Sequence, residues 1–234
     1  MIVSEMNVDL IDHMGSDLSV VNAARVSFNK TSDWEYWTSE DEPEKHNQPK
    51  LSQQDEKLIR YLAKHNHWSP FAHTSIQFRV KAPIFVVRQL AKHQVGASFN
   101  EVSRRYVDSE PEFWFPKEWR GRPEGSMKQG SSGVVNIYAR PKAYFPQSVC
   151  QMTLQCYNDL LEDGVAPEMA RMILPQNMMT EWYWTGSLMF FVRVCKLRFD
   201  SHAQEESRMI AKMIGKFCQE LFPVSWNCLV GENQ

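Results

Sequence analysis

The chain has 234 residues, of which 43% are hydrophobic, so it can bury a substantial core in one large domain. Its 26 Lys and Arg nearly cancel its 28 Asp and Glu, which argues against a protein built to bind DNA, RNA or an anionic membrane. The N-terminus is acidic where a signal peptide is basic, and about eighteen apolar residues never run together. We therefore expect a cytoplasmic protein that acts on neither membranes nor nucleic acid.

The first clear elements are a helix over residues 52–66 and a strand over 75–81. Ser52 is followed three positions later by Asp55, a variant of the capping box, and the next apolar residues fall on one stripe. The sequence SIQFRVK then alternates apolar and polar side chains. This period of two predicts a half-buried strand.

A second helix is predicted over 83–95, with Pro83 in its first turn and Gly96 at its end. On this helix three polar residues at i, i+3 and i+4 would share one face, namely Gln89, Lys92 and His93. That face offers an amide, an ammonium and an imidazole, which can hydrogen-bond a flat heterocycle or a phosphate. A solvated polar face is the alternative.

The C-terminal half predicts helices over 146–163 and 166–175, an aromatic β-segment over 176–185, and a long core-facing helix over 201–222. This order is not regular βαβ alternation. It predicts an α+β fold with helices packed against a sheet.

Two polar stretches without clear period, near 29–50 and 120–132, are interpreted as surface insertions in a single domain spanning 1–234. No GxGxxG follows a strand, and no GxxxxGK[ST] occurs. The histidines lack metal-site spacing, so we expect no metal. The five cysteines have no CxxC pair and mostly stand among apolar helical neighbours, which favours buried reduced thiols.

The segment RQLAKHQVGASFNEVSRRY, residues 88–106, concentrates positive charge in a nearly neutral chain. If its second half is extended, Ser103 and Arg105 share one face, and a hydroxyl beside a guanidinium grips phosphate well. The segment could be a solvated basic edge, a pocket for an anionic small molecule, or, with RRY and nearby tryptophans as stacking platforms, a nucleic-acid patch.

The same segment resembles the signature of flavin-dependent thymidylate synthases, in which an RHR triplet precedes S-x-R by a short interval. Here the triplet reads KHQ (92–94), and the spacing is one residue longer than the commonest one. Five separated blocks resemble the family in the same order, and roughly three quarters of the chain is covered. These blocks are LSVVNAARVSF (18–28), HNHWSPFAH together with KAPIFVVRQ (65–73 and 81–89), ARMILP (170–175) and LRFDSHAQ (197–204).

The resemblance implies a homotetramer that makes thymidylate (dTMP) from deoxyuridylate (dUMP), with active sites drawing residues from several subunits. It implies methylenetetrahydrofolate as carbon donor, FAD as hydride source and NADPH or NADH as its reductant, without a cysteine nucleophile. On matching positions, the dUMP residues are Gln89, Lys92, Glu101, Ser103, Arg105, Arg171 and Arg198. The FAD residues are Ser69, Lys92, His93, Gln94, Glu101, Ser187 and Arg193. Arg198 and His67 are the implied catalytic residues.

Some positions depart from the family. Lys92 cannot make the bidentate contact of an arginine. Around TGSLMFFVR the family commonly has Asn-x-Arg, whereas this chain has Ser187 and Met189, and Arg193 would supply the charge from one helical turn on. Cys195, flanked by cations, leaves a cysteine-dependent methyltransferase open as an alternative.

Overall fold

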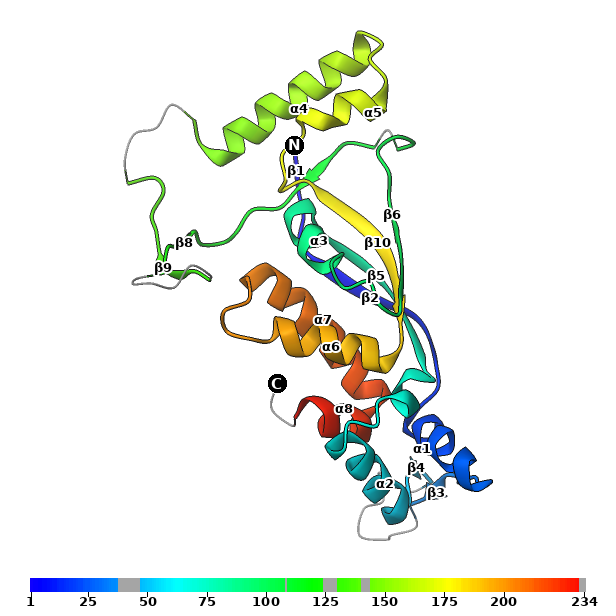
Figure 1. Cartoon of the computed structure of the whole chain (residues 1–234). Helices are drawn as coiled ribbons and strands as arrows, with labels where there is room; N and C mark the ends of the chain where they lie inside the picture. Colours follow the sequence, from blue (N-terminus) through cyan, green and yellow to red (C-terminus); the bar gives the residue numbers. More distant parts are fainter. Residues whose placement is uncertain (38–46, 108, 124–129, 140–143, 232–234) are drawn as a thin grey trace.

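The structure is a computed structural model that describes residues 1–37, 47–107, 109–123, 130–139 and 144–231. Its centre is a four-stranded antiparallel sheet in the order β2-β5-β10-β6 (Figure 1). The strands are β2 (Asn7–Met14), β5 (Ser75–Pro83), β10 (Met179–Gly186) and β6 (Ala97–Glu101). An α+β fold is confirmed.

The two faces of this sheet differ because the side chains of its central strands alternate. In β5, Ile76, Phe78 and Val80 are fully buried. Trp182 and Trp184 lie opposite Val80 and Phe78 on β10 and are buried on the same face. The predicted strand is therefore confirmed, and the opposite face carries charged side chains.

Helices cover the apolar face. α3 (Ile84–Leu90), α6 (Leu188–Arg198) and α7 (Glu205–Leu221) pack against β5, β10 and β2 respectively (Figure 1). The predicted helix over 201–222 is confirmed except that it begins at Glu205. The β-segment predicted from 176 begins only at Met179.

The remaining helices lie at the two ends of an elongated molecule (Figure 1). At one end are α1 (Asp17–Arg25), α2 (Gln53–Lys64) and α8 (Pro223–Val230), with the short η1 (Val26–Phe28) and η3 (Ser69–Ala72). Ser52 caps α2 as predicted, since its hydroxyl accepts the Asp55 N–H at 3.1 Å. At the other end are α4 (Pro146–Glu162), α5 (Pro167–Ala170) and η4 (Arg171–Ile173), which confirm the helices predicted there.

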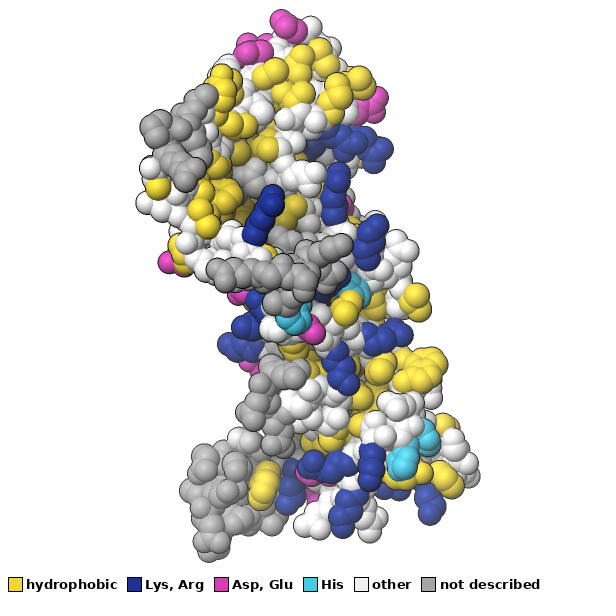
Figure 2. Space-filling view, turned by 60° about the vertical axis from the view of Figure 1, so that its left-hand side comes forward, with side chains coloured by type: hydrophobic (Ala, Val, Ile, Leu, Met, Phe, Trp, Pro, Cys, Tyr) yellow, Lys and Arg dark blue, Asp and Glu magenta, His cyan; other side chains and the backbone are white. Residues whose placement is uncertain are grey.

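A second hydrophobic cluster lies beneath α4, apart from the main core, and includes Phe113, Cys150 and Leu154. Figure 2 shows hydrophobic side chains gathered over this end and Lys and Arg spread over the rest of that face. The single domain over 1–234 stays a prediction. Among the described residues, no helix is long and apolar enough to cross a bilayer.

Short two-stranded ladders complete the fold. β1 (Ile2–Val3) pairs in parallel with β7 (Glu112–Phe113). The first polar stretch forms β3 (Glu35–Tyr36) and β4 (Pro49–Lys50), which pair with each other, while its residues 38–46 lie outside the described part. The second begins with β8 (Arg120–Gly121), which pairs with β9 (Ser132–Val134), and its residues 124–129 likewise lie outside.

Candidate active site

The helix predicted over 83–95 is wrong in its length, because α3 ends at Leu90. In a continued helix the His93 N–H would donate to the Gln89 carbonyl. Instead the His93 N–H donates to the Leu90 carbonyl at 3.0 Å, and Arg198 Nη2 donates to the Gln89 carbonyl at the same distance. Lys92 and His93 therefore lie in a turn and not on a shared helix face with Gln89.

Arg198 is the last residue of α6 and reaches back to this turn. Besides its bond to Gln89, its Nε donates to His93 Nε2 at 3.2 Å. The guanidinium is half-buried, and burial lowers the pKa of Arg198, although an arginine stays charged at neutral pH. Both partners of this cation are neutral groups.

His93 must be uncharged for this arrangement, because only an unprotonated Nε2 can accept the Arg198 N–H. Burial lowers the pKa of His93, and the charges of Arg198 and Arg193 lower it further. The neutral imidazole thus orients the guanidinium without neutralising it.

The side chain of Gln89 is held from α7. Its Nε2 donates to Gln204 Oε1, and its Oε1 accepts the hydroxyl of Ser207 at 3.0 Å. Ser207 is fully buried. We refer to Gln89, His93, Arg198, Gln204 and Ser207 as the Gln89 cluster.

A cleft of about 940 Å³ opens beside the start of α6, and we call it the Arg193 cleft. Met189 and Arg193 both line it, as their i, i+4 spacing on a helix predicts. Arg193 Nη2 donates to the Val95 carbonyl at 3.3 Å. The other lining residues include Trp68, Gly96, Ser98 and Ser187.

The lining of the Arg193 cleft fits a flavin. The exposed ring of Trp68 offers an aromatic surface, three serine hydroxyls offer hydrogen bonds, and Arg193 offers a positive charge. Gly96 has φ +83°, a backbone conformation that lets the chain turn into β6. The volume lies in the range of cofactor sites.

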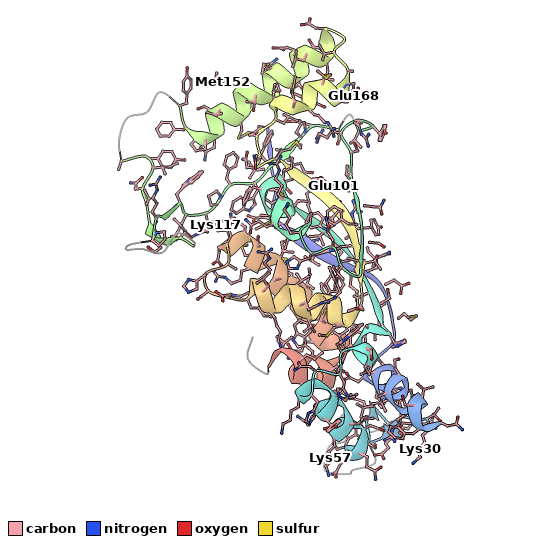
Figure 3. All side chains as sticks on the ribbon, viewed as in Figure 1. Lys30, Lys57, Glu101, Lys117, Met152 and Glu168 are labelled. Atoms are coloured by element: carbon pink, nitrogen blue, oxygen red, sulfur yellow. The ribbon has the colours of Figure 1, made fainter. Side chains whose placement is uncertain are left out.

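A second, more polar cleft of about 580 Å³ lies between the open face of the sheet and α5, and we call it the Arg171 cleft. Figure 3 labels two of its lining residues, Glu101 at the sheet and Glu168 on α5. Glu101 accepts the hydroxyl of Thr180 at 3.0 Å. The cations that line it are Arg79, Lys81, Arg88, Arg104 and Arg171.

Two of these cations are already neutralised. Arg79 is ion-paired with Glu181, and Lys81 lies 2.6 Å from Glu112. Arg171 is exposed, and its Nε donates to the Glu168 backbone carbonyl at 3.4 Å. In the described part of the chain, Arg171 forms no ion pair with a carboxylate.

The extended conformation predicted for 100–106 is wrong beyond Glu101, where β6 ends. A turn follows, closed by the Tyr106 N–H donating to the Ser103 carbonyl at 3.0 Å. Ser103 and Arg105 nevertheless lie together, since Arg105 Nε donates to the Ser103 hydroxyl at 3.0 Å. The Arg105 guanidinium also lies 4.9 Å from the Tyr106 ring centroid.

The other predicted site residues are exposed. His67 and Ser69 flank Trp68 of the Arg193 cleft, and Lys92 and Gln94 flank His93. One chain therefore brings Gln89, His93 and Arg198 together, but it places Glu101 and Arg171 in a different cleft.

The cysteines separate into two groups. Cys150, Cys195 and Cys218 are buried, as predicted, but Cys156 is exposed and Cys228 is half-buried. Burial raises the pKa of Cys195 far above its ordinary value, so this thiol is not a thiolate at neutral pH. Among the described residues, no three His, Cys, Asp or Glu side chains gather as a metal site would require.

Trp68, Gln204 and Ser207 are site residues that the sequence did not single out. Trp68 and Gln204 stand inside blocks that carried the family resemblance, so those blocks were the available signal. Ser207 had none, because its partner Gln89 is 118 positions away in the chain.

An α+β scaffold with an oriented arginine, a polar cationic cleft and a cofactor-sized cleft is the arrangement that an enzyme acting on an anionic small molecule requires. A sequence family described as "Thymidylate synthase complementing protein" matches residues 9–224. The chain belongs to this family, that of the flavin-dependent thymidylate synthases.

Individual relatives agree. The chain is 37% identical to a flavin-dependent thymidylate synthase of Kosmotoga olearia, covering 95% of this chain and 89% of that protein. It is 38% identical to a flavin-dependent thymidylate synthase of Thermus thermophilus, covering 94% of this chain and 73% of that protein. Its structure is similar to the UMP/dUMP methylase PolB of Streptomyces cacaoi bound with 5-Br UMP, with TM-score 0.79, 29% identity and 99% and 97% coverage.

Proposed function

We propose that the enzyme converts dUMP to dTMP by reductive methylation, with 5,10-methylenetetrahydrofolate as carbon donor and FAD, reduced by NADPH or NADH, as hydride source. The observation that carries this proposal is the half-buried Arg198, which is held by two neutral acceptors near the turn that borders the Arg193 cleft. A cation without a carboxylate partner is available to an electron-rich ligand.

The residues that would hold FAD are Ser187 and Arg193 of the Arg193 cleft, with Ser69 next to its lining residue Trp68 and Gln94 next to its lining residue Val95. Lys92 and His93 in the adjacent turn would contribute as well, whereas Glu101, which lines the Arg171 cleft in one chain, would have to come from another subunit. When bound, FAD supplies the hydride. His67 beside Trp68 would contribute to the flavin environment.

Arg198 would act on the pyrimidine. A ring that accepts hydride at C6 must be electron-poor, because the addition places negative charge on C5 and O4. A guanidinium donating to the uracil O2 would withdraw electron density from the ring and so favour this addition. His93 aims the guanidinium, and its neutrality leaves the full positive charge for the substrate. No cysteine is required for this step, which agrees with the buried Cys195.

The phosphate of dUMP would be bound by the other cations. Arg171 has no carboxylate partner among the described residues, and the Ser103 and Arg105 pair offers a hydroxyl beside a guanidinium. Glu101 in the same cleft would accept from a ligand hydroxyl or N–H.

We propose further that the protein is a homotetramer in which the Gln89 cluster of one subunit faces the Arg171 cleft of another. What supports this is the separation of the two groups in one chain, although both match dUMP residues of the family. A cytoplasmic location is part of the same proposal.

The test is dTMP formation by purified protein supplied with dUMP, methylenetetrahydrofolate and NADPH, with and without FAD. Turnover should require FAD, and a variant with all five cysteines replaced by serine should keep it. A flavin absorbance spectrum should persist after dialysis against buffer containing FAD and then against buffer without it. Absence of bound flavin together with FAD-independent turnover would contradict the proposal.

UMP is a second candidate substrate, because the PolB structures are described as a UMP/dUMP methylase. The relatives with higher identity are thymidylate synthases, so we expect dUMP to be preferred. Competition between UMP and dUMP in the same assay measures this preference directly.

A further inference from the structure

We propose that Gln204 and Ser207 are positioning residues that lock the Gln89 carboxamide in the orientation that reads uracil and rejects cytosine. This inference rests on the proposed function and on the family match that makes Gln89 a dUMP residue, and it assigns the uracil ring as the part of dUMP that Gln89 contacts. Neither residue touches the substrate in this scheme, because both act through Gln89.

Gln89 is fixed at both its backbone and its side chain. Arg198 Nη2 donates to its carbonyl at 3.0 Å, at the end of α3. From α7, Ser207 donates to Oε1 at 3.0 Å and Gln204 accepts from Nε2. A carboxamide held at both its oxygen and its nitrogen, by Ser207 on α7 and by Gln204 just before α7, has little freedom to rotate.

The lock leaves one donor and one acceptor of Gln89 free. A carboxamide has two N–H donors and an oxygen with two lone pairs. Gln204 takes one N–H and Ser207 one lone pair, which leaves one N–H and one lone pair for a ligand. Such a pair can bind a group that presents an acceptor next to a donor.

The uracil edge presents that pattern, because N3–H is a donor and O4 an acceptor. With Arg198 donating to O2, Gln89 Oε1 would accept from N3–H and Nε2 would donate to O4. Cytosine presents an acceptor at N3 and an amino donor at N4, so both contacts with a locked Gln89 would be repulsive.

A free carboxamide would not discriminate in this way, since a half-turn about its last bond exchanges oxygen and nitrogen. Discrimination therefore depends on what holds the amide. Ser207 is fully buried and Gln204 is half-buried. Water therefore competes poorly for the hydrogen bond between Ser207 and Gln89.

The experiment measures the dissociation constants of dUMP and dCMP for the FAD-loaded enzyme by calorimetry. We expect the wild type to prefer dUMP by about 10²-fold or more, since a site built for particular hydrogen bonds rejects a mismatched analogue strongly. Gln204→Met, similar in length but without a hydrogen bond, should lower the preference about tenfold. Ser207→Ala should lower it in the same direction.

Gln204→Glu provides the rescue, because a carboxylate only accepts and keeps Nε2 of Gln89 turned towards it. Its dUMP to dCMP preference should stay close to that of the wild type. The matched control is Gln155→Met on α4. It removes an exposed amide that donates to Asp159 at 2.8 Å, and it should leave the preference for dUMP over dCMP unchanged.

An unchanged preference in Gln204→Met and Ser207→Ala, with dUMP still bound, would overturn the lock. If Gln204→Met fails to fold, as judged by its melting curve, Ser207→Ala alone decides the question by the same ratio. Failure of the wild type to bind dUMP at all would instead contradict the proposed function, so the two failures are distinguishable.

Discussion

The helical end, by which we mean the end formed by α1, α2 and α8, differs from the Gln89 cluster in how its buried charges are paired. Asp55 on α2 is buried, and its carboxylate accepts Arg25 Nη2 at 2.5 Å, Ser52 at 2.8 Å and Ser32 at 2.9 Å. Arg198 is half-buried, and its partners are a carbonyl and a neutral imidazole.

This difference separates charges that stabilise the fold from charges kept for a ligand. Burial alone would raise the pKa of Asp55, but hydrogen bonds from Arg25, Ser52 and Ser32 outweigh it and the pKa is lowered. Nothing comparable offsets the desolvation of Arg198. A ligand with negative charge would offset it, so the site should gain stability on binding that the helical end cannot gain.

The largest expected effect is the loss of Arg25. Arg25→Ala leaves the Asp55 carboxylate buried beside two hydroxyls only, which should lower the free energy of unfolding by about 3 kcal/mol. Urea unfolding measures this. Arg60→Ala is the control, since Arg60 and Glu56 form an exposed pair that contributes less than about 1 kcal/mol. If Arg25→Ala and Arg60→Ala lowered the free energy of unfolding equally, the buried ion pair would contribute no more to stability than the exposed one.

Arg198→Ala should reverse that pattern. We expect turnover to fall by about 10²- to 10³-fold, the effect of removing a group that stabilises developing charge. The free energy of unfolding should fall little, because Arg198 forms no ion pair with any residue in the described part of the chain. Steady-state kinetics and urea unfolding of the same preparation decide between this and a structural role, which would lower stability instead.

Asp17 gives a smaller effect at the helical end. Its two carboxylate oxygens accept the N–H groups of Val224 and Ser225, at 2.8 and 2.9 Å, in the first turn of α8. Asp17→Ala should lower the free energy of unfolding by about 1–2 kcal/mol. Asp17→Asn keeps one acceptor oxygen, so it should lower the free energy of unfolding less than Asp17→Ala does. An equally large loss in the two variants would show that the charge of Asp17 matters more than its hydrogen bonds.

The smallest effect is a pH dependence from His93. Its pKa is lowered, through burial and then through Arg198 and Arg193, so the folded protein binds the proton less readily than the unfolded chain. Its contribution to stability is thus fully present above the unfolded pKa of about 6.5 and is lost as pH falls towards the lowered folded pKa.

His93→Gln removes this titration. The wild type should therefore lose more stability than His93→Gln between pH 7 and pH 5, as measured by urea unfolding at each pH. Parallel curves for the two proteins would show that His93 is protonated as easily in the folded state as in the unfolded one.

Local patterns predicted the elements whose cause is local. The alternation of Ile76, Phe78 and Val80 defined β5, and Ser52 marked the start of α2. The early end of α3 could not be predicted, because the Gln89 carbonyl is taken by Arg198, 109 positions away. Likewise the strand pattern continues in the sequence beyond Glu101, and β10 still has Met179–Glu181 beyond its last pair with β6. The turn that ends β6 is closed by the hydrogen bond from the Tyr106 N–H to the Ser103 carbonyl, which the alternation of side chains does not indicate.

The site shows the same limit. Family blocks supplied Gln89, His93 and Arg198, which the structure brings together. Residue identity alone did not indicate that Glu101 and Arg171 would lie in another cleft, since that depends on how α5 packs over the sheet.

The most direct test of the central claim, that these two groups form one dUMP site between subunits, is complementation. Arg198→Ala and Arg171→Ala, each nearly inactive alone, would be co-expressed in equal amounts. If a site takes Arg198 from one subunit and Arg171 from another, random assembly restores about a quarter of wild-type dTMP formation. Activity no higher than that of the two variants separately would contradict the claim.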